Sequence, residues 1–340
     1  MIKEVLKKLI NREHLDEVEA TNIFDAMING KLTDAQISCF LTLLVSNGES
    51  ATEIAAAAKI MRLHCLKVPT KLRNLVDTCG TGGDGSNSFN VSTGAAFIAA
   101  AAGVNIAKHG NRSASSNSGS ADLLEEAGAQ INLSPEKVAY CIENLGIGFM
   151  FAPNHHKATK KVVAIRKELG IRTLFNLVGP LTNPAGVSTQ VIGIFDTNLI
   201  EKYLEVLIRL DYKRAMVLAS KDGLDEISIA SNTIVGELVD GKYRISELSP
   251  EKLGIKKYDN PKINVKDSKE SLGMIRSAFA GKRSASFDML TLNAAAVIYI
   301  GGKSKNLKEG VKIAKTLLQS GEVANLFDKY IETTIRLADE

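Results

Sequence analysis

Residues 75–103 read LVDTCGTGGDGSNSFNVSTGAAFIAAAAG, an apolar run followed by a glycine-rich segment and then an alanine-rich segment. The run LVDTC has the length and apolar content of a short buried strand. The segment STGAAFIAAAAG is typical of a helix, which Ser92 and Thr93 would open. A strand that turns through glycines into a helix indicates an α/β fold whose loop approaches an anionic ligand.

The same alternation continues along the chain. Strands are predicted at 104–110, 190–195 and 214–220, and helices at 92–103, 120–128, 134–146 and 198–210. Residues 232–246 predict a hairpin with Asp240 and Gly241 at its turn. The last sixty residues again have helical spacing. Strands that alternate with helices predict a central, mostly parallel sheet flanked by helices.

Residues 1–66 differ, because their apolar positions recur at helical spacing throughout. Thr33 and Ser50 are the expected N-caps of two of these helices, and Pro69 ends the pattern. We therefore predict an α/β protein with a small all-helical N-terminal domain, residues 1–70, and a larger α/β domain, residues 71–340. A chain of 340 residues is long enough for two such units.

The composition is that of a globular protein, with 45% hydrophobic residues and a net charge of +4. No apolar run is long enough to span a membrane, and residues 1–12 have the pattern of an amphipathic helix, so we expect a cytoplasmic protein without membrane association. The charge excess suits anionic small molecules and is too weak to indicate nucleic acid. The four cysteines form no C-x-x-C motif and are expected to be reduced: Cys39, Cys65, Cys79 and Cys141.

The glycine-rich segment matches G-x-G-x-x-G at Gly80, Gly82 and Gly85. A P-loop is excluded because no lysine follows the last glycine before the next strand. A dinucleotide-binding motif is disfavoured because eight residues separate these glycines from the helix. The interpretation that remains is a two-part anion site, in which loop amides and the helix start at residues 90–93 face a ligand. A tight turn followed by an N-cap is the alternative.

A second anion site is predicted in AKHGNRSASSNSGSAD, residues 107–122. Lys108 and Arg112 flank a glycine where a strand ends, and serines follow. Because the carboxyl ends of neighbouring parallel strands share one edge of the sheet, both loops are expected to meet there. A solvated polar loop would explain the serines but not the basic cluster.

Two carboxylates and one arginine complete the candidate site. Asp225 and Glu226 in DGLDEIS are either a solvated pair or ligands for Mg²⁺ beside phosphates, and a cation would explain Asp84 among phosphate-binding amides. Arg166 either meets a substrate carboxylate through its fork or lies on a helix surface. His155 and His156 are adjacent, so their side chains are expected to point in different directions and to make a poor metal pair.

Four segments in this order carry a resemblance: GTGGDG with NSFNVST, KHGNRSASSNSGSAD, FAPNHHKATKKVVAIRKELGIRTLFNLVGPLTNP and GLDEIS. They resemble the anthranilate phosphoribosyltransferases over nearly the whole chain. The resemblance implies transfer of the phosphoribosyl group of 5-phosphoribosyl 1-diphosphate to the amino group of anthranilate, with release of pyrophosphate, in tryptophan biosynthesis. It also implies Mg²⁺ as cofactor, a homodimer, and a helical domain joined by part of residues 160–187.

The resemblance further implies a role for each matching residue. Those expected to bind substrate are Gly80, Gly83, Asp84, Ser88, Asn90, Val91, Ser92, Thr93, Lys108, His109, Gly110, Asn111, Arg112, Ser113, Ala114, Ser115, Ser116, Ser120 and Arg166. Ser92, Asp225 and Glu226 are expected to hold the magnesium ion. Arg166, Asp84 and His109 are the candidate catalytic residues, with His109 the nearest group for the amine proton. Departures from the family pattern at Ser88, Ser113-Ala114 and Lys157 remove no donor.

Two other functions stay open at this level. A pyrimidine nucleoside phosphorylase-like enzyme shares the implied fold, but the Asp225-Glu226 pair argues against it because that reaction needs no diphosphate. A non-enzymatic relative that binds nucleic acid would use surface lysines, yet these alternate with acids and the chain has no Trp. The sequence does not decide whether an anthranilate synthase subunit associates with the chain.

Overall fold

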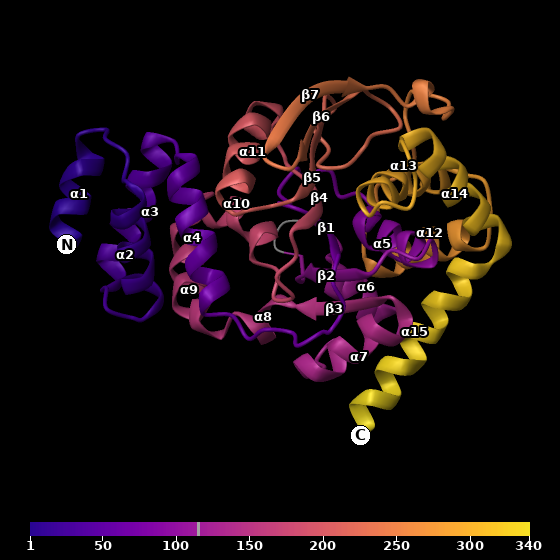
Figure 1. Cartoon of the computed structure of the whole chain (residues 1–340), viewed down its shortest axis with the longest axis horizontal. Helices are drawn as coiled ribbons and strands as arrows, with labels where there is room; N and C mark the ends of the chain where they lie inside the picture. Colours follow the sequence, from indigo (N-terminus) through magenta and orange to yellow (C-terminus); the bar gives the residue numbers. More distant parts are fainter. Residues whose placement is uncertain (114–115) are drawn as a thin grey trace.

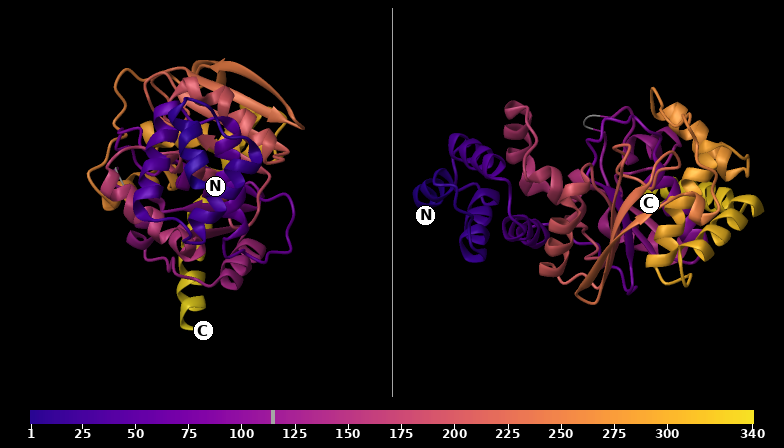
Figure 2. Two further views of the ribbon diagram at one scale, coloured as in Figure 1. Left: turned by 90° about the vertical axis from the view of Figure 1, so that its left-hand side faces the viewer. Right: turned by 90° about the horizontal axis from the view of Figure 1, so that it is seen from above.

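The computed structural model describes residues 1–113 and 116–340. Figure 1 shows a helical bundle at one end of a larger part, in which helices surround a twisted sheet, and Figure 2 shows the bundle projecting from that part. The bundle consists of α1 (Ile2–Ile10), α2 (Glu17–Ile28), α3 (Asp34–Asn47) and α4 (Ala51–Leu63). The predicted division into a helical part and an α/β part is confirmed.

Local capping sets where the bundle helices begin. Thr33 and Ser50 are the N-caps of α3 and α4, as predicted, and each forms a reciprocal capping box with the side chain three residues later. Further along the chain, α9 (Lys160–Leu169) adds Val162 and Ile165 to the hydrophobic cluster that α1–α4 share with the adjoining face of the sheet. The chain after residue 160 therefore packs with the N-terminal helices.

The sheet has seven strands in the order β3-β2-β1-β4-β5-β6-β7. Its first five strands run parallel, and β6 and β7 extend it as an antiparallel hairpin. The strands are β1 (Val76–Gly80), β2 (Ile106–Gly110), β3 (Ile147–Phe151), β4 (Thr189–Gly193), β5 (Arg214–Ser220), β6 (Thr233–Val239) and β7 (Lys242–Leu248). The predicted strands are confirmed, whereas β3 was not among them because its apolar residues precede a helix without a turn signal.

Two local features test the predicted element boundaries. Asp240 and Gly241 both have positive φ, 47° and 78°, as a tight hairpin turn requires. The helix after the glycine loop, α5 (Val91–Ala101), begins one residue before Ser92, with Asn90 as its N-cap. This small shift from the prediction leaves Ser92 and Thr93 in the first turn, where backbone N–H groups lack helical partners.

Helices bury both faces of the sheet. Along β5, Met216 and Leu218 point into the cluster formed with the C-terminal helices, and Ala215 and Val217 point to the opposite cluster. The remaining helices are α6 (Ser120–Glu126), α7 (Pro135–Leu145), α8 (Ala152–His155), α10 (Phe175–Val178), α11 (Ile200–Arg209), α12 (Ser268–Phe279), α13 (Ala285–Ile300), α14 (Leu307–Ser320) and α15 (Glu322–Asp339). Among the described residues, no helix combines the length and apolarity needed to cross a membrane.

The strand order fixes where a ligand can bind. From β1 the chain passes to β2, which pairs with one edge of β1, and β4 later pairs with the other edge of β1. Loops leave the carboxyl ends of β1 and β4 in diverging directions, which opens a crevice between them. The glycine-rich segment lies at this position, and the 107–122 segment follows the neighbouring strand.

Candidate active site

A cleft of about 410 Å³ lies at the carboxyl ends of the parallel strands. Most of the residues predicted to form a site line it: Gly80, Gly83, Asp84, Ser88, Asn90, Val91, Ser92, His109, Gly110, Asn111, Arg112, Ser113, Ser116, Ser120, Arg166, Asp225 and Glu226. Thr93 and Lys108 lie behind this lining. Ala114 and Ser115 lie outside the described residues. The fold thus brings together segments that are far apart in the sequence.

The glycine loop has a second structural reason for its glycines. Gly82, Gly83 and Gly85 have φ of 65°, 78° and 69°, a region that other residues adopt at a cost. At Gly80 a Cβ atom would collide with the carboxylate of Asp225. The N–H of Gly82 donates to Asp225 Oδ2 at 3.0 Å. Gly80 therefore leaves room for the Asp225 side chain, and the other glycines allow the backbone conformation that exposes loop amides.

Three carboxylates, Asp84, Asp225 and Glu226, gather at one side of the cleft. Burial, and then the neighbouring charge of Asp84, raise the pKa of Asp225 to about 7. Burial, and then Asp225, raise the pKa of Glu226 well above its usual value, while Lys108 opposes this shift. Asp84 accepts from the N–H of Ser86 through Oδ1 at 3.1 Å, and its Oδ2 is buried with no partner among the described residues.

These carboxylates suit a cation, because a positive charge would relieve their mutual repulsion and satisfy Asp84 Oδ2. Residues 1–113 and 116–340 nevertheless contain no group of three or more side chains already arranged as metal ligands. One or two carboxylates completed by substrate phosphates are what Mg²⁺ typically uses. The donor set therefore fits a magnesium ion that arrives with a phosphorylated ligand.

Lys108 is buried and faces the protein behind the cleft wall. Its Nζ donates to the carbonyl of Thr78 at 2.6 Å and to Ser92 Oγ at 3.2 Å. Burial lowers the Lys108 pKa, and the charges of Asp77, Cys79 and Glu226 oppose that shift. Lys108 thus fixes Ser92 at the start of α5, beside the carboxylates.

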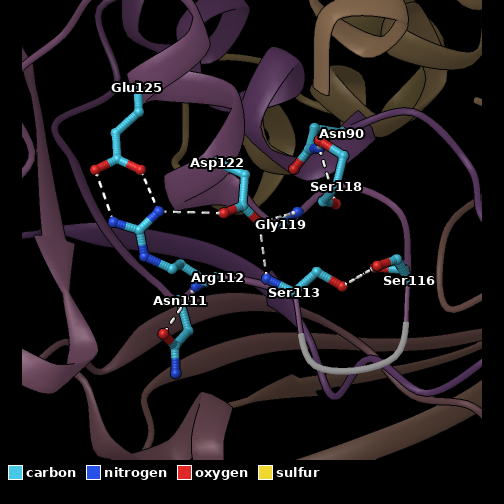
Figure 3. Close-up of polar contacts among 9 residues, drawn as sticks. All are labelled: Asn90, Asn111, Arg112, Ser113, Ser116, Ser118, Gly119, Asp122 and Glu125. Carbon is cyan, nitrogen blue, oxygen red and sulfur yellow. Dashed lines mark hydrogen bonds and ion pairs between the residues drawn. The ribbon is translucent and has the colours of Figure 1, made fainter. Parts of the chain in front are cut away.

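The serine-rich loop is held by side chains of its own segment and of α6 (Figure 3). Asp122 Oδ2 accepts from the N–H groups of Ser113 and Gly119, both at 2.9 Å. Asn90 Nδ2 donates to Ser118 Oγ at 2.7 Å, which ties this loop to the first one. Because Asp122 already accepts hydrogen bonds from two loop N–H groups, fewer N–H groups of this loop remain to bind a ligand.

The guanidinium of Arg112 is held by carboxylates of α6. It pairs with Glu125 through both terminal nitrogens and lies 3.4 Å from Asp122 Oδ1 (Figure 3). Its predicted contact with substrate therefore requires these pairs to open, and it stays a prediction.

Two neutral imidazoles meet at the back of the cleft. The rings of His109 and His156 are 5.3 Å apart, and each has a buried Nε2 without a partner among the described residues. Burial is the main reason that the pKa of His109 is well below 6.5 and that of His156 is about 4. His155 points elsewhere, with Nδ1 2.7 Å from the carbonyl of Leu66. The prediction that the adjacent histidines diverge is confirmed.

Arg166 is partly buried on α9 and lines the cleft. Its Nη2 donates to Asn176 Oδ1 at 3.1 Å, and its guanidinium lies 5.6 Å from the centre of the Phe175 ring. Its Nε is buried with no partner among the described residues. Burial lowers the pKa of Arg166, yet an arginine stays charged. A planar anion such as a carboxylate would satisfy this group.

Sequence reasoning missed the wall opposite the glycine loop. Phe175, Asn176, Gly179 and Pro180 all line the cleft. They lie within the third segment of the resemblance, FAPNHHKATKKVVAIRKELGIRTLFNLVGPLTNP, but no role was predicted for any of them. The guanidinium of Arg172, which lies 4.3 Å from the Phe195 ring centre, also donates to the carbonyl of Gly83. This contact links the wall side to the glycine loop.

Comparisons with known proteins agree over almost the whole chain. The family described as "Glycosyl transferase family, helical bundle domain" matches residues 3–65, and "Glycosyl transferase family, a/b domain" matches residues 72–324. An anthranilate phosphoribosyltransferase of Hydrogenovibrio crunogenus is 44% identical over 334 residues, which are 98% of each chain. One of Acetivibrio thermocellus is 43% identical over 98% of this chain and 97% of that one.

Solved structures give the same result. The crystal structure of anthranilate phosphoribosyltransferase from Thermus thermophilus has a TM-score of 0.91 and 39% identity, and covers 97% of this chain and 99% of that chain. The Saccharomyces cerevisiae enzyme in complex with PRPP and Mg has a TM-score of 0.90 and 27% identity, with 98% of each chain covered. The same yeast enzyme in complex with 4-fluoroanthranilate has a TM-score of 0.89 and 26% identity, again with 98% of each chain covered.

Proposed function

The chain belongs to the anthranilate phosphoribosyltransferases of the glycosyl transferase family, and from this premise we propose how its cleft carries out the transfer. The reaction moves the phosphoribosyl group of 5-phosphoribosyl 1-diphosphate to the amino nitrogen of anthranilate and releases pyrophosphate. Two subsites are therefore needed, one rich in amides and hydroxyls for the phosphorylated donor and one for an aromatic carboxylate. The two sides of the cleft differ in this way.

We assign the donor to the side formed by the glycine loop, the start of α5 and the serine loop. Loop amides and the free N–H groups of the first helical turn suit phosphate oxygens. Asp225, Glu226 and Ser92 would hold Mg²⁺, which when bound offsets charge on the diphosphate and so improves it as a leaving group. The unsatisfied oxygen of Asp84 supports this assignment, and so does the yeast relative in complex with PRPP and Mg.

We assign anthranilate to the opposite side, where Arg166 would bind its carboxylate, with Asn111 and the backbone at Gly80 beside its amine. The amine lone pair attacks C1 of the ribose, and the C1–O bond to the diphosphate breaks with its electron pair leaving on pyrophosphate. The proton then leaves the nitrogen, and neutral His109 can accept it through its free Nε2. The yeast relative in complex with 4-fluoroanthranilate supports an aromatic acceptor in this family.

We also propose a cytoplasmic homodimer whose helical domain, residues 1–70 with part of 160–187, forms the interface. The family resemblance supports this arrangement. Three apolar side chains of α1, α2 and α4 are more than 60% exposed and give positions at which the interface can be tested: Ile10 at 63%, Val18 at 68% and Leu63 at 67%.

The observation that carries the acceptor assignment is the buried, unpartnered Nε of Arg166 beside Phe175. Anthranilate fluorescence should decay only when both 5-phosphoribosyl 1-diphosphate and Mg²⁺ are present. Arg166→Ala should raise the KM for anthranilate at least about tenfold, since a charged hydrogen bond contributes roughly 1.5–3 kcal/mol. Donor affinity should stay within twofold of the unsubstituted protein.

Two results would contradict this proposal. An unchanged KM for anthranilate in Arg166→Ala would move the acceptor away from this arginine. Absence of decay in a protein that instead cleaves pyrimidine nucleosides with phosphate would favour the nucleoside phosphorylase alternative.

A further inference from the structure

Beneath the cleft lies a carboxylate, Asp77 of β1, to which none of the roles above assigns a function. Its side chain is fully buried. Oδ1 accepts from the backbone N–H groups of Thr78 at 2.8 Å and His109 at 3.1 Å. Oδ2 accepts from Asn183 Nδ2 at 2.8 Å and Gln190 Nε2 at 3.2 Å. The Cys79 thiol also donates to Oδ2, at 3.7 Å, so five donors converge on one interior carboxylate from β1, β2, β4 and the chain after α10.

The partners of Asp77 hold the acceptor-side wall to the floor of the cleft. Asn183 Nδ2 also donates to the carbonyl of Ala107 in β2 at 2.8 Å. Gln190 Nε2 also donates to the carbonyl of Pro180 at 2.8 Å, and Pro180 lines the cleft. The turn at residues 179–183 is therefore bonded at two points to the strands that carry the donor-side loops.

The same bonds continue into the helical part. Tyr212, which is buried, donates from its hydroxyl to Gln190 Oε1 at 2.7 Å. Arg62 of α4 donates from Nη2 to that hydroxyl at 2.8 Å, and from Nε to the carbonyl of Leu181 at 2.6 Å. An unbroken series of hydrogen bonds therefore runs from α4 to the backbone of His109.

We propose that Asp77, Gln190, Tyr212 and Arg62 are positioning residues that set the acceptor-side wall relative to the donor-side floor. None of the four lines the cleft, and this inference rests on the assignment of anthranilate to the Arg166 side. A single buried hydrogen bond makes only a small net contribution to folding stability. A displacement of about 1 Å at reacting groups can nevertheless cost roughly a hundredfold in rate. The network should therefore matter more for turnover than for stability.

Tyr212→Phe tests the proposal with little change in shape, whereas Asp77→Asn would set an amide against two donors and could prevent folding. We expect Tyr212→Phe to fold, and its kcat/KM for anthranilate to fall at least about tenfold. Its dissociation constant for 5-phosphoribosyl 1-diphosphate with Mg²⁺, measured by calorimetry, should stay within twofold. Arg62→Lys, which cannot make both of its bonds, should behave alike. The double variant should be no worse than the stronger single, because both break one series.

Tyr299→Phe is the matched control, since it removes a hydroxyl that donates to Glu237 Oε1 at 2.6 Å between α13 and β6. Because Tyr299 is only half-buried, Tyr299→Phe should lower Tm no more than Tyr212→Phe does. It should leave kcat/KM for anthranilate and the dissociation constant for 5-phosphoribosyl 1-diphosphate unchanged. Unchanged kcat/KM for anthranilate in Tyr212→Phe would overturn the proposal, and so would an equal loss of donor binding. Additive losses in the double variant would also count against a single series. Failure of the unsubstituted protein to consume anthranilate would instead refute the acceptor assignment itself.

Discussion

At the residue scale, the site is built from side chains whose ordinary ionisation is altered by their surroundings. Asp225 stands between a loop amide at Gly82 and a second carboxylate at Asp84, and its pKa rises to about 7. His109 stays neutral because burial disfavours its charged form. The first group therefore needs a cation in order to ionise fully, and the second can take up a proton only transiently. Both properties suit a phosphoribosyl transfer that begins when a magnesium-bound donor arrives.

The raised pKa of Asp225 makes a prediction about stability and pH. Below pH 3.8, its usual pKa, the carboxyl is protonated in folded and unfolded chains alike, so it costs the fold nothing. Between that value and about pH 7 the unfolded chain ionises while the folded chain resists, so wild-type stability falls. Asp225→Asn should therefore match wild type near pH 4 and exceed it by about 3 °C in Tm above pH 7.

Differential scanning calorimetry without added metal measures this difference. The outlying Asp222→Asn serves as control, because Asp222 bonds only Ser228 Oγ among the described residues. A gain for Asp225→Asn that is equal at pH 4 and pH 8 would contradict the assigned repulsion. Turnover should be lost in Asp225→Asn at both pH values.

At the element scale, the ends of strands place the chemistry. Gly193 is the last residue of β4, and a Cβ there would collide with the backbone carbonyl of Asp225. Close packing of the β4 end against the loop after β5 thus holds the proposed metal-binding pair, Asp225 and Glu226, over the crevice. No sequence pattern predicted that residue 193 must be glycine, because Gly193 and Asp225 are brought together by the parallel pairing of β4 with β5.

Gly193→Ala should therefore displace the Asp225 loop. We expect the Tm to fall and the Mg²⁺ concentration for half-maximal turnover to rise at least about tenfold, since an ångström-scale shift at a catalytic group is costly. The matched control is Gly273→Ala in α12, where a Cβ meets nothing within 4 Å. That change should be neutral or slightly stabilising. An unchanged magnesium requirement in Gly193→Ala would show that the loop tolerates the added methyl group.

The sequence predicted some elements of the fold and not others. The strands around the glycine loop, the hairpin turn and the capped N-terminal helices have local signals, and the structure confirms them. β3 and the wall at Phe175–Pro180 have no such signal, because their positions follow from packing between distant segments. The same limit applies to Arg112: its sequence neighbours suggested a ligand contact, while the fold supplies Glu125 as a partner.

At the scale of the whole molecule, the helical part and the α/β part share one hydrophobic cluster through α9 and α10. The cleft lies where these parts meet, so its shape depends on how the helical part is seated. The exposed apolar residues of that part are then candidates for contact with a second copy. Assembly and catalysis would be linked through the same helices.

Ile10→Glu combined with Leu63→Glu should turn the proposed homodimer into a monomer, because burying two carboxylates in an apolar interface is costly. Light scattering after size-exclusion chromatography measures the mass directly. Ile335→Glu on α15, at a side chain that is 42% exposed, is the control and should leave the mass unchanged. A monomeric unsubstituted protein would refute the dimer, and a dimeric double variant would place the interface elsewhere.

The sheet order has a consequence for synthesis on the ribosome. β1 lies beside β4 in the finished sheet, and Val76 pairs with Thr189, so one edge of β1 has no partner until the chain beyond residue 193 has emerged. The four N-terminal helices make short-range contacts and can form first. In the nascent α/β part, by contrast, the edge of β1 that pairs with β4 stays unpaired until β4 has been synthesised, and an unpaired strand edge favours aggregation. Translation through residues 81–193 is thus the interval in which we expect chaperone protection to matter most.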